Sequence, residues 1–352
     1  MSLEETYAVL LDPAAPLDAR LRDLYKLKES ALKTEEGVSI LIKCIDRTDS
    51  VLLQHEVVYN IGQSGQLCAI PALEKVLKNE KVNDDGKPVQ YDTVTRHEAA
   101  EALGAIGGAN ARTTLEYYYK EENESEAAIR ESCALALARI YMEVEKGKEA
   151  LQIPNNCPYV SVDPTPAFNE KTVKVADLSD LQTAHHLSST NSTHAIPAVP
   201  TTVSELETIL LDTENQYSII QRYMAMFTLR NIATKEAVAV LCRALRQDTR
   251  SALFRHEVAF VLGQLEHKSS EAALVECLRD EKEHAMVRHE AAEARGGRSP
   301  RTAPSPSCRS TPLTRSLLYG IAVSWPWRCT SIGPTLIKPR LPTKSNYILV
   351  FF

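Results

Sequence analysis

The sequence lacks the features of a membrane or secreted protein. No run of about eighteen apolar residues occurs, so no membrane-spanning helix is expected. The first residues, MSLEETYAVLLDP, contain neither a basic segment nor a long apolar core, and we expect no signal peptide. The eight cysteines are irregularly spaced without any CxxC pair. This pattern is typical of reduced thiols in a cytosolic protein rather than of a disulfide framework.

Acidic residues are absent from one part of the chain. Residues 295–352 contain no Asp or Glu and nine Lys or Arg, which leaves 31 basic and 46 acidic side chains in residues 1–294. That part therefore carries a net charge of −15, although the formal charge of the whole chain is only −6. An acidic body argues against nucleic acid or an anionic membrane as partner, and it favours a basic segment of another protein.

The sequence does contain a repeated motif. RHEAAEA occurs at Arg96 and again at Arg288, and the variants QHEVVYN at Gln54 and RHEVAFV at Arg255 carry the same His-Glu pair. The same apolar frame, without the pair, recurs at positions 21, 131 and 223. The steps between neighbouring units are 34, 42 and 34 residues, and then 33 and 33. A period of about 33–34 residues predicts stacked units of two helices each.

Each unit has the pattern of a helical hairpin. KEAVAVLCRALRQ, residues 235–247, has its apolar residues at helical spacing, and endings such as IGQSG and LGAIGG stop the second helix of a unit. The signatures of ankyrin and tetratricopeptide repeats are absent. The step of 42 residues is explained by a polar loop, NEKVNDDGKPVQYDT, at residues 79–93. We therefore predict an all-α fold of HEAT-like helical-hairpin repeats in two pseudo-symmetric halves joined by a long linker.

The expected domains follow from where the repeat is interrupted. Four hairpins span about 1–150, a Pro/Ser/Thr-rich linker spans 151–202, and a second set of hairpins spans 203–294. After Ala294 the frame calls for a continuation like Leu103-Gly104, but the chain gives Arg295-Gly296-Gly297. We hypothesise that the basic tail, 295–352, is disordered and comes from a shifted reading frame or a retained intron. The fourth hairpin of the second half is then missing, and we expect reduced activity because the last His-Glu helix is cut short.

The arrangement of the His-Glu pairs indicates a metal centre. The units at positions 21, 131 and 223 keep the apolar frame without the pair, so the hairpin does not need it to fold. The four pairs form two couples, 55/97 and 256/289, one in each half. Packed helices lie about 8–10 Å apart, which lets two imidazoles from neighbouring hairpins meet at one metal ion. Two His and a carboxylate suit non-haem iron, although this ligand set alone does not exclude manganese or zinc.

Four His-Glu pairs on HEAT-like hairpins, two in each half with a linker between them, resemble the deoxyhypusine hydroxylases over about residues 1–294. The resemblance implies a monooxygenase in the cytoplasm and nucleus with two Fe(2+) per chain. It would hydroxylate the deoxyhypusine side chain of translation factor 5A to hypusine, using O2 and a reductant. No catalytic residue beyond the metal centre is implied. The implied iron ligands are His55, His97, Glu98, His256, His289 and Glu290, and the implied substrate-binding residues are Glu56 and Glu257.

Two other interpretations of the repeats remain open at this point. One is a HEAT-type scaffold that binds a basic protein segment without chemistry. The other is a lyase-like chromophore-binding protein, because single strings of the RHEAAEALG type also occur in HEAT-like repeats of that kind. Neither alternative explains why the His-Glu pairs form two matched couples, and neither is expected to contain iron.

Overall fold

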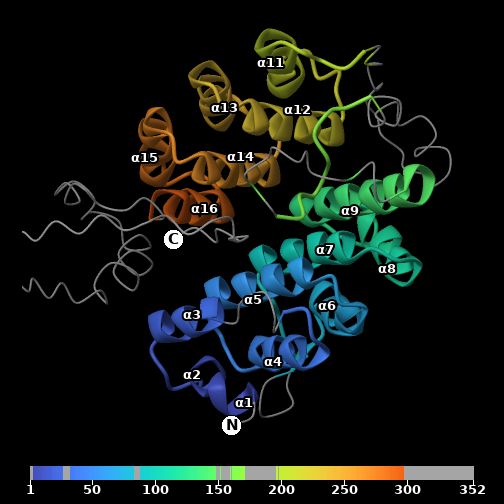
Figure 1. The fold of residues 1–352 in the computed structure, drawn as a ribbon, viewed down its shortest axis with the longest axis vertical. Helices are drawn as coiled ribbons and strands as arrows, with labels where there is room; N and C mark the ends of the chain where they lie inside the picture. The colour runs from blue at the N-terminus through green and yellow to red at the C-terminus, as the bar shows by residue number, and fades with distance from the viewer. Residues whose placement is uncertain are drawn as a thin grey trace, which may run out of the picture.

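The computed structural model describes residues 3–26, 32–82, 88–147, 151, 159, 161–170, 196 and 198–296. Helices account for nearly all of its regular structure and stack along the longest axis of the molecule, as predicted from the repeats (Figure 1). Among the described residues, no helix combines the length and the apolar character needed to cross a membrane. The predicted fold class is thus confirmed. The predicted tail beyond Gly296 lies outside the described residues.

The described residues of the first half form successive helical hairpins and a small hairpin of two strands. In chain order its helices and strands are α1 (Leu3–Thr6), α2 (Ala8–Leu11), α3 (Leu17–Lys26), α4 (Glu35–Asp46), α5 (Val51–Ser64), the 3-10 turn η1 (Leu67–Ala69), α6 (Ile70–Leu77), β1 (Lys81–Val82), β2 (Pro88–Val89), α7 (Thr93–Ile106), α8 (Ala109–Tyr119) and α9 (Ala127–Lys146). The antiparallel strands β1 and β2 lie within the segment predicted as a polar loop.

The second half repeats the hairpin arrangement. Its elements are α11 (Val203–Leu211), α12 (Ile219–Ile232), α13 (Lys235–Gln247), α14 (Ala252–Leu265), the 3-10 turn η3 (Lys268–Ser270), α15 (Glu271–Arg279) and α16 (Ala285–Gly296). The helix that carries His289 begins earlier than that residue and contains twelve residues. Its last turn is held by an ion pair between Arg295 Nε and Glu271 Oε1 at 2.8 Å, so it is better anchored than the sequence led us to expect.

Local capping fixes where the His-bearing helices start. Ser50 accepts a hydrogen bond from the N–H of Leu53, and Ser251 accepts one from that of Phe254. At the start of α7, the side chain of Asp92 accepts a hydrogen bond from the N–H of Val94, two residues further on. These side chains satisfy donors that a helix N-terminus would otherwise leave unpaired. As a result, α5, α7 and α14 each begin at the same distance before their histidine.

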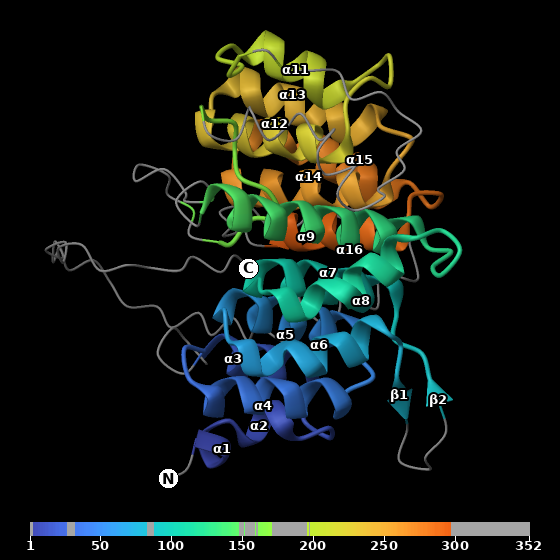
Figure 2. The same ribbon diagram turned by 90° about the vertical axis from the view of Figure 1, so that its right-hand side faces the viewer.

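The two halves meet at the middle of the stack. The long helix α9 of the first half packs against α12 and α14 of the second, and Figure 2 shows α9 and α16 between α7 and α14. Across this junction the hydroxyl of Ser251 donates a hydrogen bond to Glu131 Oε2 at 2.6 Å. Glu131 stands at the repeat position that carries a histidine in the intact motifs. At this repeat the position therefore holds the two halves together instead of contributing a histidine.

Part of the segment predicted as a linker is integrated into the core. Residues 161–170 are described, and Asp163, Thr165 and Phe168 within them are buried. The main-chain N–H of Phe168 donates to the hydroxyl of Thr228 in α12 at 2.9 Å. The described part of this segment is therefore a packed element, which its prolines and lack of period did not indicate.

Glycines allow the His-bearing helices to approach one another closely. A Cβ placed on Gly62 in α5 would lie 2.8 Å from the backbone of Ala102 in α7, and one on Gly263 in α14 would lie 2.9 Å from Ala294 in α16. Real Cβ atoms do not pack so closely against backbone, so each pair of helices requires its glycine. The same contact recurs in both halves and sets the spacing within each half.

The Gly62→Ala variant is expected to be less stable than the wild type. Alanine favours a helix over glycine by about 1 kcal/mol, but the overpacked contact with Ala102 costs roughly 1–3 kcal/mol and moves α5 away from α7. The matched control is Gly296→Ala, because a Cβ at Gly296 meets nothing within 4 Å. Urea unfolding of both variants measures the difference, and equal stability would contradict the role given to Gly62.

The junction at Glu131 is expected to depend on pH. Burial raises the pKa of Glu131 to about 7, well above that of an unfolded chain. A raised pKa stabilises the fold below the unfolded value, and that contribution is lost as the pH rises through the folded value. Relative to wild type, Glu131→Gln should therefore gain stability between about pH 5 and about pH 8, by up to ~3 kcal/mol. Denaturant unfolding at both pH values tests this, and a constant difference between the two proteins would contradict it.

Candidate metal centre

Four helices, two from each half, carry the His-Glu pairs. In each of α5, α7, α14 and α16 the histidine is the fifth residue, just beyond the first turn. The side chains of His55, His97 and His256 are almost entirely buried, and that of His289 is 9% exposed. Equal placement on equivalent helices directs all four imidazoles toward the junction of the halves.

The four imidazoles form one cluster. Ring centroids lie 5.6 Å apart for His55 and His97, which belong to the first half. Two of the pairs that cross between the halves are closer still, with 4.9 Å between His97 and His256 and 5.1 Å between His55 and His289. The halves thus face each other as the matched couples of the sequence suggested.

Two of the predicted carboxylate ligands have equivalent positions in the two halves. Glu98 Oε2 lies 3.4 Å from His55 Nε2, and Glu290 Oε2 lies 3.4 Å from His256 Nε2. In each case a glutamate of the second His-bearing helix reaches the histidine of the first. All six residues predicted as ligands are brought together, and their coordination of iron stays a prediction.

Two further glutamates at the centre were missed by the sequence analysis. Glu101 Oε1 lies 3.7 Å from His97 Nδ1, and Glu293 Oε1 lies 3.1 Å from His289 Nε2. The potential ligand atoms of His97, Glu98 and Glu101 all lie within 4.8 Å of one another, as do those of the equivalent residues of α16. The signal was present in RHEAAEA, whose second glutamate follows the histidine by four residues and so shares its helix face.

The electrostatics of the cluster keep two imidazoles neutral. Burial, together with the neighbouring histidines, lowers the pKa of His97 and of His289 well below the usual value. Burial and nearby carboxylates raise the pKa of Glu101, Glu257 and Glu293 well above the usual value of a glutamate. A neutral imidazole is the form that binds a metal ion, and a cation would favour the charged carboxylates.

Several buried nitrogen atoms at the centre make no hydrogen bond. They are both ring nitrogens of His97, both of His256, and Nε2 of His55 and of His289. A buried polar atom without a partner costs about 1–3 kcal/mol, so a protein rarely gathers several at one point unless a ligand satisfies them. Buried neutral imidazoles beside carboxylates fit a metal ion of the iron, manganese or zinc type.

A cavity of about 270 Å³ opens beside the histidines. Both predicted substrate-binding residues, Glu56 and Glu257, line it, and Lys33 is the only Lys or Arg among its described lining residues. The hydroxyl of Tyr25 donates to Glu56. Burial alone would raise the pKa of Glu56, but hydrogen bonds from His55 and Tyr25 lower it overall. Glu56 therefore gives the cavity negative charge suited to a cationic side chain.

Known proteins share this sequence and fold. A family model described as HEAT repeats matches residues 203–296, and one described as PBS lyase HEAT-like repeat matches 95–116. Deoxyhypusine hydroxylase of Drosophila pseudoobscura pseudoobscura is 38% identical over 72% of this chain and 67% of its own length. That of Gallus gallus is 36% identical over 72% of this chain and 68% of its own. The solved structure of human deoxyhypusine hydroxylase in complex with glycerol matches with a TM-score of 0.66 and 31% identity, covering 91% of this chain and 93% of that one.

The chain belongs to the deoxyhypusine hydroxylase family. The resemblance seen in the four His-Glu pairs is thus confirmed, and with it the prediction that the protein is an enzyme of this family. The match to a PBS lyase HEAT-like repeat covers only residues 95–116, within α7 and α8, so it reflects the repeat rather than a chromophore site.

Proposed function

We propose that this chain hydroxylates the deoxyhypusine side chain of translation factor 5A to hypusine, at a centre of two iron ions, using O2 and a reductant. The observation that carries the proposal is the convergence of four buried imidazoles from both halves, with Glu98 and Glu290 beside them. The activity named in the relatives supports the same reaction.

The metal would be held by one set of ligands from each half. One ion would be held by His55, His97 and Glu98. The other would be held by His256, His289 and Glu290. When bound, iron supplies the binding and activation of oxygen. The protein contributes the rigid placement of these ligands, and its packed helices exclude bulk water from them. Glu101 and Glu293, one turn after His97 and His289, are placed to orient those two imidazoles.

The substrate would enter the cavity as an extended cationic side chain. Its amines carry positive charge, and a carboxylate is a strong partner for an ammonium group that leaves water. Glu56 and Glu257 line the cavity from opposite halves, so we place one amine near each. The net negative charge of residues 1–294 also suits a basic segment around the modified residue.

A scaffold without chemistry explains less of the structure. A binding surface alone has no use for ring nitrogens that are buried without hydrogen bonds, because each of them lowers stability. No feature of the described residues favours that alternative. The reduced activity expected from residues 295–352 remains a prediction, although α16 extends to Gly296 and holds His289 in the cluster.

Elemental analysis of the purified full chain should give about two irons per chain. His97→Ala should lower this number, because His97 has both ring nitrogens buried at the centre of the cluster. His267→Ala is the control, because His267 caps the 3-10 turn η3. There its Nδ1 accepts a hydrogen bond from the main-chain N–H of Ser269. No iron in the wild type would contradict the metal centre, and one iron would show that only one half holds its ion.

Substitution of a substrate anchor should separate binding from metal loading. Glu257→Gln keeps the size of the side chain but cannot become negatively charged opposite the ammonium of the substrate, so KM for the deoxyhypusine-bearing protein should rise about tenfold or more, equivalent to ~1.4 kcal/mol. Its iron content should stay unchanged. Glu290→Gln, in the same half, should instead lose iron. Steady-state kinetics with iron analysis measures both, and loss of iron in Glu257→Gln would make that residue a ligand.

A further inference from the structure

Two His-bearing helices from different halves, α5 and α14, face each other at three successive levels. The first level is His55 and His256, whose ring centroids lie 5.9 Å apart. One turn on, the rings of Tyr59 and Phe260 meet at 6.3 Å. Gln63 and Gln264 follow after one more turn. Residues spaced by four share a helix face, so the separation at the third level is transmitted to the histidines.

At the third level the two helices meet through a separate segment. Residues 161–168, which we call the strap, pass between them. Gln63 Oε1 accepts a hydrogen bond from the N–H of Val162 at 2.7 Å, and its Nε2 donates to the carbonyl of Val162 at 3.4 Å. Gln264 Nε2 donates to the hydroxyl of Ser161 at 3.3 Å. Equivalent glutamines of the two halves thus hold neighbouring residues of the strap.

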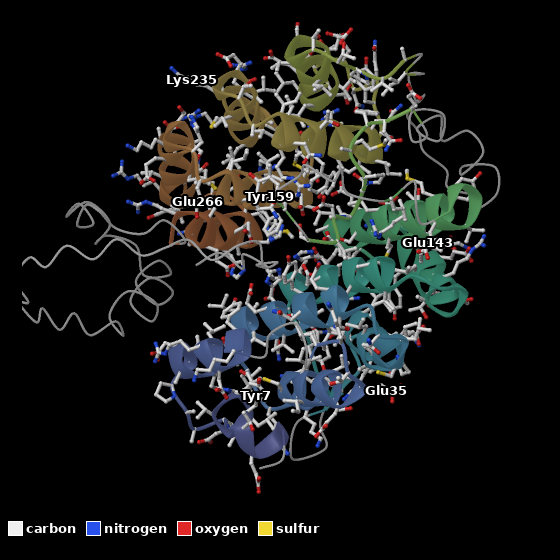
Figure 3. The ribbon with its side chains drawn as sticks, in the orientation of Figure 1. Tyr7, Glu35, Glu143, Tyr159, Lys235 and Glu266 are labelled. Carbon is white, nitrogen blue, oxygen red and sulfur yellow. The ribbon has the colours of Figure 1, made fainter. Side chains whose placement is uncertain are left out.

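The strap is anchored by one buried ion pair. Both oxygens of Asp163 accept from the two terminal nitrogens of Arg230 in α12, at 2.8 and 2.6 Å. Arg230 also donates to Gln264 Oε1 at 3.0 Å, and its guanidinium lies 4.8 Å from the ring of Tyr159. Figure 3 shows Tyr159 near the middle of the molecule, where the halves meet. From the first half, Arg139 of α9 donates to the carbonyl of Asp163 at 2.7 Å.

We propose that Asp163 is a positioning residue for the reaction: through Arg230 it fixes the strap, which sets the separation of α5 and α14 and so brings the imidazoles of the two halves together. The strap also forms a wall of the cavity, since Val162, Asp163 and Pro164 line it. The inference rests on the proposed function for the metal centre that this separation serves. The contacts of the strap that carry it involve none of the predicted ligands.

The chain contains a matched control for this ion pair. Arg222, two turns before Arg230 on α12, pairs with Asp248 at 2.7 Å, and both of their side chains are at most 4% exposed. Arg222 also stacks on an aromatic ring, that of Phe254, at 3.8 Å. This pair lies wholly within the second half and does not touch the strap. Loss of either aspartate therefore leaves a buried arginine poorly paired, but only loss of Asp163 releases α5 from α14.

The test compares full-length wild type with Asp163→Asn and Asp248→Asn by two measurements. Amide hydrogen exchange of the metal-free protein should be at least tenfold faster at the C-terminal ends of both α5 and α14 in Asp163→Asn. In Asp248→Asn the exchange of α5 should stay at the wild-type rate. Titration with Co2+, whose visible absorption reports coordination geometry, should show at least tenfold weaker binding and an altered spectrum in Asp163→Asn only.

Several results would overturn the inference. Wild-type hydrogen exchange in α5 together with wild-type Co2+ binding in Asp163→Asn would be one such result. Equal losses in Asp248→Asn would reduce the effect to general instability. The double variant Gln63→Ala/Gln264→Ala strands no buried charge, so it provides the same test if Asp163→Asn fails to fold. If wild type binds no Co2+, the proposed metal centre fails, and the exchange pattern alone then decides the role of the strap.

Discussion

The approach of glycine to alanine between neighbouring helices is the constraint on which the metal centre depends. Gly62 faces Ala102 and Gly263 faces Ala294, each at a distance that leaves no room for a Cβ. The histidines lie about two turns earlier on α5 and α14, so the same contact that closes each helix pair also fixes how far apart the imidazoles stand. Within each half, the contact between glycine and alanine therefore determines the distance between the two histidines.

Much of this architecture could be predicted from the sequence because it is periodic. The apolar frame predicted two-helix units, and the four His-Glu pairs predicted which helices would carry the centre. Equivalent positions in repeats face the same way, so His55 and His97 were expected to meet, and they do. The symmetry of the two couples also predicted that the two halves face each other. The contact of His97 with His256 agrees with this prediction.

The rest could not be predicted, for two different physical reasons. The strap has no periodic pattern, and its structure comes from partners distant in the chain, such as Arg230 for Asp163. Glu101 and Glu293 were visible in the repeated string, but their helix face had been assigned no role beyond the His-Glu pair. The helical frame after Ala294 was judged from residue types alone, which did not reveal that Arg295 is held by Glu271.

The small hairpin of β1 and β2 bears on how such proteins are found. His55 and His97 are 42 residues apart in the chain, whereas His256 and His289 are 33 apart. The additional residues include the hairpin, which projects from the side of the stack and leaves the α5–α7 contact as close as that of α14 with α16 (Figure 2). A search that fixes the spacing between His-Glu motifs would therefore detect one half of this protein and overlook the other. Chain length between ligands is free to drift here, because an outward loop absorbs it without disturbing the helices that aim the side chains.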